Sequence, residues 1–140
     1  FLKLGVIDEQ DGRFRLIEKT LDESYFNSPD SIFISARPLK IMDITGDGVP
    51  EILIFANKGR YGANLHVLRY LNTEIKEISV IDNFIYPTYT FFDQNKDGVL
   101  EIKVVGEKPC AYSALLPECQ NMPTEGIFKY DVKDDVFNPI

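Results

Sequence analysis

Short stretches in which apolar and polar residues alternate run along most of the chain, and they predict β-strands rather than helices. Turn-forming residues separate these stretches at short intervals, so neighbouring strands are expected to pair in antiparallel fashion. The predicted fold class is therefore all-β. The expected strands span residues 2–7, 13–18, 39–43, 51–56, 64–70, 74–81, 86–92, 101–105, 126–131 and 135–137.

One pattern is present twice, beginning at Asp43 and again 50 residues later at Asp93. Each copy is an apolar strand, an acidic loop of pattern D-x-[T/N]-x-D-G-x-x-E, and a second apolar strand, which indicates an array of one repeated unit. Four short antiparallel strands per unit are what a propeller blade contains. We predict one repeat domain of about two and a half such blades over the whole chain. The sequence does not decide whether these blades close into a ring. Its parts are a partial blade in 1–31, a blade in 32–83, and a blade in 84–140 with a cysteine-containing insertion over 106–125.

The acidic loops carry oxygen ligands at the spacing that a hard cation needs. Side-chain oxygens at loop positions one, three, five and nine, with a backbone carbonyl at position seven, can surround one Ca²⁺, and glycine at position six allows the sharp turn. An EF-hand also needs a bidentate glutamate at position twelve, where this chain has Ile54 and Val104. We therefore expect calcium loops that join strands. The predicted ligands are Asp43, Thr45, Asp47, the carbonyl of Val49 and Glu51 in the first loop, and Asp93, Asn95, Asp97, the carbonyl of Val99 and Glu101 in the second.

This pattern of strand, acidic loop and strand resembles the FG-GAP/VCBS family of calcium-binding β-propeller repeats, as in integrin α-chain heads and many secreted bacterial proteins. The resemblance covers residues 38–56 and 88–106. It implies a propeller-type fold, up to two Ca²⁺ ions per chain and a role in recognition or adhesion. The chain departs from the family pattern at Thr45, a weaker ligand than Asp or Asn, and at Glu51 and Glu101, where the family usually has Asp.

Composition and charge narrow the function classes. Hydrophobic residues make up 44% of the chain and aromatic residues 12%, which favours a globular fold over disorder. The net charge of −7 comes from 22 acidic against 15 basic side chains, without a basic cluster, so we expect no nucleic-acid partner. No apolar run approaches the ~20 residues of a membrane helix. An Asp-Gly pair by itself makes a good turn, but a turn does not require further oxygen-bearing positions at fixed spacing, twice.

The two cysteines, Cys110 and Cys119, lie close together in a proline-containing stretch and match no zinc spacing. We expect a short-loop disulfide between them, which implies an oxidising compartment; two unrelated buried thiols are the alternative. Calcium loops of modest affinity also suit extracellular calcium concentrations. The predicted location is secreted, cell-surface or periplasmic. The chain begins directly on a predicted strand without a signal peptide, so we expect a mature form or a piece of a longer chain.

Recognised catalytic motifs are missing from the sequence, which has no nucleophile elbow, P-loop or metalloprotease helix motif. The single histidine, His66, lacks identifiable triad partners, and we expect it to be a surface or satisfied polar residue. We predict a non-enzymatic, extracytoplasmic calcium-binding module that supports protein or carbohydrate recognition, with Tyr61 and Tyr112 as candidate contact residues. An accessory or regulatory domain of a larger secreted hydrolase is the alternative. Because an open array leaves unpaired faces, a homo-oligomer, a longer parent chain or a compact non-propeller sheet arrangement is expected to resolve them.

Overall fold

The computed structural model describes five segments of the chain, residues 3–10, 12–20, 40–58, 62–108 and 122–140. The predicted disulfide between Cys110 and Cys119 lies outside these segments, as do the predicted contact residues Tyr61 and Tyr112. These predictions therefore stay predictions.

The described residues form ten β-strands and no helix, so the predicted all-β class is confirmed. Every pairing is antiparallel. No helix in the described segments has the length and apolar character needed to cross a membrane. The strands are β1 (Lys3–Gln10), β2 (Arg13–Thr20), β3 (Lys40–Met42), β4 (Glu51–Lys58), β5 (Gly62–Leu71), β6 (Glu74–Ile81), β7 (Ile85–Phe92), β8 (Glu101–Lys108), β9 (Met122–Asp131) and β10 (Val136–Pro139).

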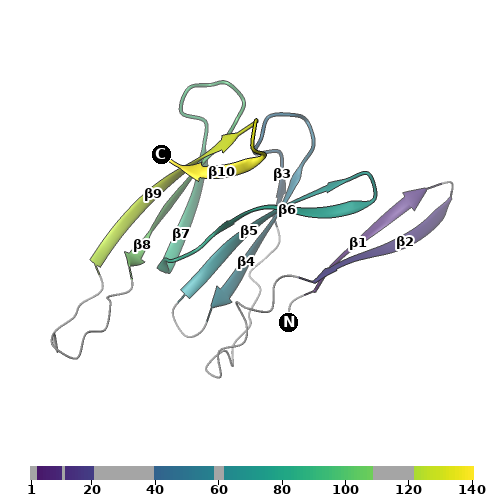
Figure 1. The fold of residues 1–140 in the computed structure, drawn as a ribbon, viewed down its shortest axis with the longest axis horizontal. Helices are drawn as coiled ribbons and strands as arrows, with labels where there is room; N and C mark the ends of the chain where they lie inside the picture. The colour runs from purple at the N-terminus through teal and green to yellow at the C-terminus, as the bar shows by residue number, and fades with distance from the viewer. Residues whose placement is uncertain (1–2, 11, 21–39, 59–61, 109–121) are drawn as a thin grey trace.

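The strands form two consecutive four-stranded meanders, as Figure 1 shows. We call β3 to β6 the first unit and β7 to β10 the second unit. Within each unit every strand pairs with the next one along the chain. In the described segments, strand pairing between the units is confined to Gly62↔Ile85. This is the blade-type architecture that the repeated pattern predicts. The described strands do not close into a ring.

Both units contain strands that extend beyond the alternating stretches in the sequence. The predicted insertion over 106–125 was too wide, because β8 and β9 continue to pair as far as Lys108↔Met122. Gly106 and Pro123 lie within this ladder, and their weak strand propensity hid it. Backbone pairing with a neighbouring strand, rather than local alternation, sets these strand ends.

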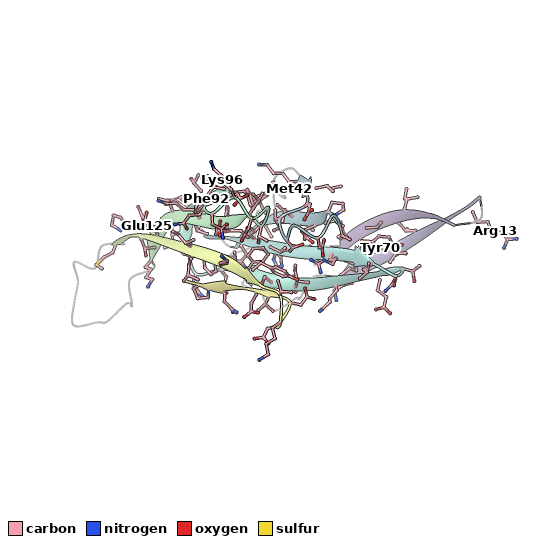
Figure 2. The ribbon with its side chains drawn as sticks, turned by 90° about the horizontal axis from the view of Figure 1, so that it is seen from above. Arg13, Met42, Tyr70, Phe92, Lys96 and Glu125 are labelled. Carbon is pink, nitrogen blue, oxygen red and sulfur yellow. The ribbon has the colours of Figure 1, made fainter. Side chains whose placement is uncertain are left out.

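Both faces of the first unit are covered. Alternate side chains of its strands point to opposite faces, so each face contributes to a separate core. One face packs against the second unit, and the other packs against the β1–β2 hairpin (Figure 1). Seen from above, the hairpin tip near Arg13 lies at one end of the molecule and Glu125 lies toward the other (Figure 2). The core between the units consists of Ile44, Leu53, Leu65, Val67, Ile78, Ile81, Ile102, Val104 and Phe137. The smaller core beside the hairpin consists of Leu4, Ile52, Ile54, Ala56, Leu68 and Ile75.

The same packing relation recurs along the molecule. Strand β2 contacts β6, and β6 in turn contacts β10. The hairpin therefore lies beside the last strand of the first unit much as that strand lies beside the last strand of the second unit. The division of the chain at residues 31/32 and 83/84 stays a prediction.

The outer face of the second unit differs from the equivalent face of the first. Superposing the two registers puts Lys103 where the first unit has Leu53, and Glu125 where it has Leu65. Both leucines are fully buried between the units. By contrast, Lys103 Nζ and Glu125 Oε2 form an exposed ion pair of 2.9 Å. These two positions are thus apolar and buried in the first unit but charged and exposed in the second.

Candidate functional site

The two acidic loops join the first and second strands of their units and lie side by side (Figure 1). We call residues 43–51 the first loop and residues 93–101 the second loop, each counted to include the glutamate that begins the following strand. The N–H of Leu100 donates a hydrogen bond of 2.9 Å to the carbonyl of Ile44. Gly46 approaches so closely that a Cβ there would lie 2.9 Å from the carbonyl oxygen of Gly98. The fold therefore brings both predicted sites to one edge of the molecule.

Each loop is shaped by hydrogen bonds from its own backbone to its aspartates. Asp43 accepts bonds of 2.7 and 2.8 Å from the N–H groups of loop positions four and six. Asp93 accepts bonds of 3.2 and 3.0 Å from positions five and six. Asp47 and Asp97 each accept one from position seven, at 2.8 and 2.9 Å. Aspartate side chains that bond nearby backbone groups favour tight turns, so both loops have an ordered shape of their own.

The carboxylate of Asp97 is held in its charged form. The N–H of Val99 donates to it, and the side-chain amide of Asn95 donates a second hydrogen bond of 2.7 Å. These bonds lower the pKa of Asp97, the backbone bond from Val99 contributing most. The second loop therefore keeps this charge at neutral pH.

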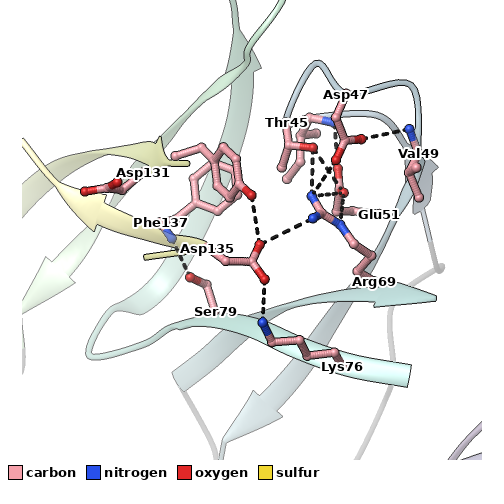
Figure 3. A network of polar contacts seen from close by, with 12 residues as sticks. Thr45, Asp47, Val49, Glu51, Arg69, Lys76, Ser79, Asp131, Asp135 and Phe137 are labelled. Carbon is pink, nitrogen blue, oxygen red and sulfur yellow. Dashed lines mark hydrogen bonds and ion pairs between the residues drawn. The ribbon is translucent and has the colours of Figure 1, made fainter. Parts of the chain in front are cut away.

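Arg69 of β5 places its guanidinium inside the first loop (Figure 3). Its Nη2 donates hydrogen bonds of 2.9 Å to both Thr45 Oγ1 and Glu51 Oε1, and its Nε donates one of 3.0 Å to Glu51 Oε1. The same Nη2 lies 3.3 Å from Asp47 Oδ2. Three of the four predicted side-chain ligands of this loop thus contact one cation that belongs to the chain.

Glu51 and Arg69 form a buried ion pair at the base of the first loop. Glu51 is fully buried, and Arg69 is 9% exposed. Glu51 also accepts hydrogen bonds from the backbone N–H of Ile44 at 3.0 Å and from the hydroxyl of Thr45 at 3.3 Å. Burial opposes the charge on Arg69, but its interactions with Glu51 and Tyr130 outweigh this effect and raise the pKa of Arg69. The raised pKa keeps Arg69 charged, and its close hydrogen bonds to Glu51 provide the partner that a buried charge needs.

Lys129 of β9 occupies the register position in the second unit that Arg69 occupies in the first. Glu101, the equivalent of Glu51, is only 2% exposed and accepts a hydrogen bond of 3.0 Å from the N–H of Gln94. Lys129 Nζ lies 3.7 Å from Glu101 Oε1, and the lysine side chain is 40% exposed. The two loops therefore have the same buried glutamate but very different neutralising cations.

Asp135 connects the first loop to the second unit. Its Oδ1 lies 3.3 Å from Arg69 Nη1 and accepts a hydrogen bond of 2.8 Å from the Tyr130 hydroxyl. Lys76 contacts its other oxygen, as Figure 3 shows. Burial raises the pKa of Asp135, but the bonds from Lys76 and Tyr130 and the charge of Arg69 outweigh it, so the pKa is lowered. The network joins three strands and one turn through charged groups.

Sequence reasoning did not identify Arg69 or Asp135. A usable signal for Arg69 was its place in the apolar alternation of β5, since a charged residue inside a covered strand needs a partner. The partner Glu51 is 18 residues away, and only the strand register places it opposite. His66 is fully buried, and its Nδ1 lies 2.6 Å from Glu77 Oε1. It is thus a buried polar residue with a polar partner rather than a surface one.

Across the described segments, no cluster of three or more His, Cys, Asp and Glu side chains stands ready to hold a metal ion. The loops would hold calcium by combining carboxylates with the amide or hydroxyl at position three and a backbone carbonyl. Searches of protein-family models, curated proteins and solved structures gave no match. The fold and the loops thus define the chain as an all-β protein of repeated four-stranded units with two adjacent acidic loops.

Proposed function

We propose that the chain is a non-enzymatic, extracytoplasmic calcium-binding repeat module of FG-GAP/VCBS type, which supports recognition of a protein or carbohydrate. In this proposal Ca²⁺ binds the second loop through Asp93, Asn95, Asp97, Glu101 and the carbonyl of Val99. The metal has a structural role there. Recognition falls to other surfaces of the repeats.

The observation that carries the proposal is the burial of Glu101 without a close cation. This carboxylate is buried, yet the nearest cation among the described residues is an exposed lysine at 3.7 Å. A buried charge without close compensation is costly. A divalent ion would compensate Glu101 together with Asp93 and Asp97, which lie in the same loop and are hydrogen-bonded mainly by backbone N–H groups. Oxygen ligands at these positions suit Ca²⁺.

Calcium would act by linking the strands on either side of the second loop, β7 and β8. The backbone bond from Leu100 to Ile44 would extend this effect to the first loop. At a free calcium concentration ~100 times the dissociation constant, one native-state site stabilises a fold by about 2.7 kcal/mol. We therefore expect calcium to raise the melting temperature measurably without being required for folding.

The proposal is tested by calcium titration calorimetry on chelator-treated protein, with thermal melting of the same samples. We expect saturable binding by the natural sequence and a calcium-dependent rise in its melting temperature. The double variant D93N/D97N should lose both, because it removes two carboxylates from the ligand set. Asp134→Asn is the matched control, since Asp134 is an exposed carboxylate in the β9–β10 turn outside either loop.

Two results would contradict the proposal. If D93N/D97N kept its calcium-dependent melting shift, the assigned ligands would be wrong. If the natural sequence bound no calcium, the second loop would be an acidic turn only. Asp134→Asn should behave as the natural sequence does; a loss of binding in this control would indicate a non-specific effect of surface charge.

A further inference from the structure

We propose that Arg69 is a built-in cation that fills the first loop in place of a metal ion, leaving the second loop as the one available to calcium. The resemblance to calcium-binding repeats implies an ion in each loop. The residues of the first loop do not fit that expectation. The contrast between the loops rests on the proposed function, but the occupation of the first loop by Arg69 does not.

The guanidinium already makes most of the side-chain contacts that an ion in the first loop would need. Thr45, Asp47 and Glu51 are three of the four predicted side-chain ligands, and Arg69 lies within 3.3 Å of each. Glu51 receives two hydrogen bonds from it. A Ca²⁺ ion at the same oxygens would lie beside a second positive charge in a buried environment, where repulsion is only weakly screened. Metal binding there would require Arg69 to leave.

Several contacts hold Arg69 in place and oppose its departure. Its side chain is largely buried, it pairs with Asp135 at 3.3 Å, and its guanidinium lies 5.9 Å from the centre of the Tyr130 ring. The planar guanidinium suits this site because it donates in several directions at once. Moving it out would leave Glu51 and Asp135 without their shared partner. The first loop is therefore closed to a metal by a network that spans both units.

Lys129 shows what the same position looks like without this closure. The lysine carries one compact charge on a flexible, 40% exposed side chain, and its Nζ is 3.7 Å from Glu101. It can move into solvent without breaking a close hydrogen bond. The two units thus differ at one register position, arginine in the first and lysine in the second, and this difference decides which loop can accept a metal.

The test uses the full chain with Asp93→Asn and Asp97→Asn, which silence the second loop, as a background. Into this background we would introduce Arg69→Met, or Arg69→Gln, whose amide can still donate to Glu51. Lys76→Met is the matched control, because it removes one positive charge from the same network without opening the loop. Calorimetric calcium titration and thermal melting, with and without calcium, are measured for each protein. Circular dichroism reports folding.

We expect the background protein and its Lys76→Met variant to bind no calcium. Arg69→Met and Arg69→Gln should each gain saturable binding and a calcium-dependent rise in melting temperature. If a variant unfolds without calcium, recovery of its β-sheet dichroism during titration counts as the same gain.

Calcium binding by the background protein would overturn the inference, because Arg69 would then not exclude the metal. It would also be overturned if neither Arg69 variant bound calcium, whether they stayed folded or failed to recover on titration. Failure of the proposed function is distinguishable, since it would appear as absent binding in the natural sequence. That result would leave the comparison of Arg69 variants unaffected.

Discussion

Two separate structural constraints favour glycine at residue 46, its backbone conformation and its close contact with the neighbouring loop. Its φ of +75° lies in the left-handed region, and a Cβ there would lie 2.9 Å from the carbonyl oxygen of Gly98 in the neighbouring loop. Gly48, two residues later, has a similar φ of +82° but has no atom within 4 Å of such a Cβ. The pair therefore separates the effect of backbone conformation from the effect of contact between the loops.

Gly46→Ala should destabilise the protein more than Gly48→Ala. Each alanine pays roughly 1–2 kcal/mol for a left-handed conformation. At residue 46 the second loop must also shift, which adds about 1–3 kcal/mol as in other overpacked sites. Denaturant unfolding of the two variants in the same buffer measures the difference. Equal losses of unfolding free energy would show that the loops do not press on each other.

At the scale of single elements, the alternating pattern of the sequence predicted where strands lie but not which of them are covered. Stretches such as Glu51–Lys58 and Glu101–Lys108 align over the repeat and both form strands. Leu53 in the first stretch is fully buried, whereas Lys103 in the second takes part in an exposed ion pair. Position within a repeat therefore does not fix burial, since burial depends on which layer packs against that face.

Leu53→Ala and Lys103→Ala test this difference at equivalent positions of the two units. The leucine truncation leaves a cavity in the core between the units, and we expect a loss of about 2–5 kcal/mol. The lysine truncation removes an exposed pair with Glu125, and we expect a change within ~1 kcal/mol. Thermal or urea unfolding provides both values. A large loss for Lys103→Ala would mean that the outer face of the second unit is covered in solution.

The polar groups of the candidate site show where sequence reasoning stops. The aspartates of each loop lie within a few residues of the backbone groups they accept, so their arrangement follows from local turn chemistry. The contacts of Arg69 with Glu51 and Asp135 span 18 and 66 residues. Such contacts depend on strand register and on the packing of one unit against another. A one-residue change in register would put Arg69 on the opposite face.

On the scale of the whole molecule, three layers follow one another: the hairpin, the first unit and the second unit. The core between the two units is apolar, but the outer face of the second unit carries Lys103 and Glu125 at the positions where the first unit has Leu53 and Leu65. Terminal members of repeat arrays have polar outer faces of this kind.

Replacing both Lys103 and Glu125 with leucine should cause the protein to self-associate through this face. K103L/E125L recreates the apolar pair found at Leu53 and Leu65, and a contiguous exposed apolar surface promotes association. We expect a larger, concentration-dependent sedimentation coefficient for this variant than for the natural sequence. K133L/E74L is the control, because it places two leucines at exposed positions outside the face, one in the β9–β10 turn and one at the start of β6. Equal association of both variants would indicate general stickiness rather than a restored interface.

The guanidinium inside the first loop is part of the polypeptide, so neither dilution nor a chelator can remove it. If Arg69 fills that loop as we propose, the Arg69 network between the two units forms at any calcium concentration, including one too low for a metal site to bind its ion. The second loop would then be the conditional part of the molecule, changing between calcium-poor and calcium-rich surroundings. One molecule would thus combine a permanent ionic link with a reversible metal link, in two loops that are joined by the 2.9 Å hydrogen bond from the N–H of Leu100 to the carbonyl of Ile44.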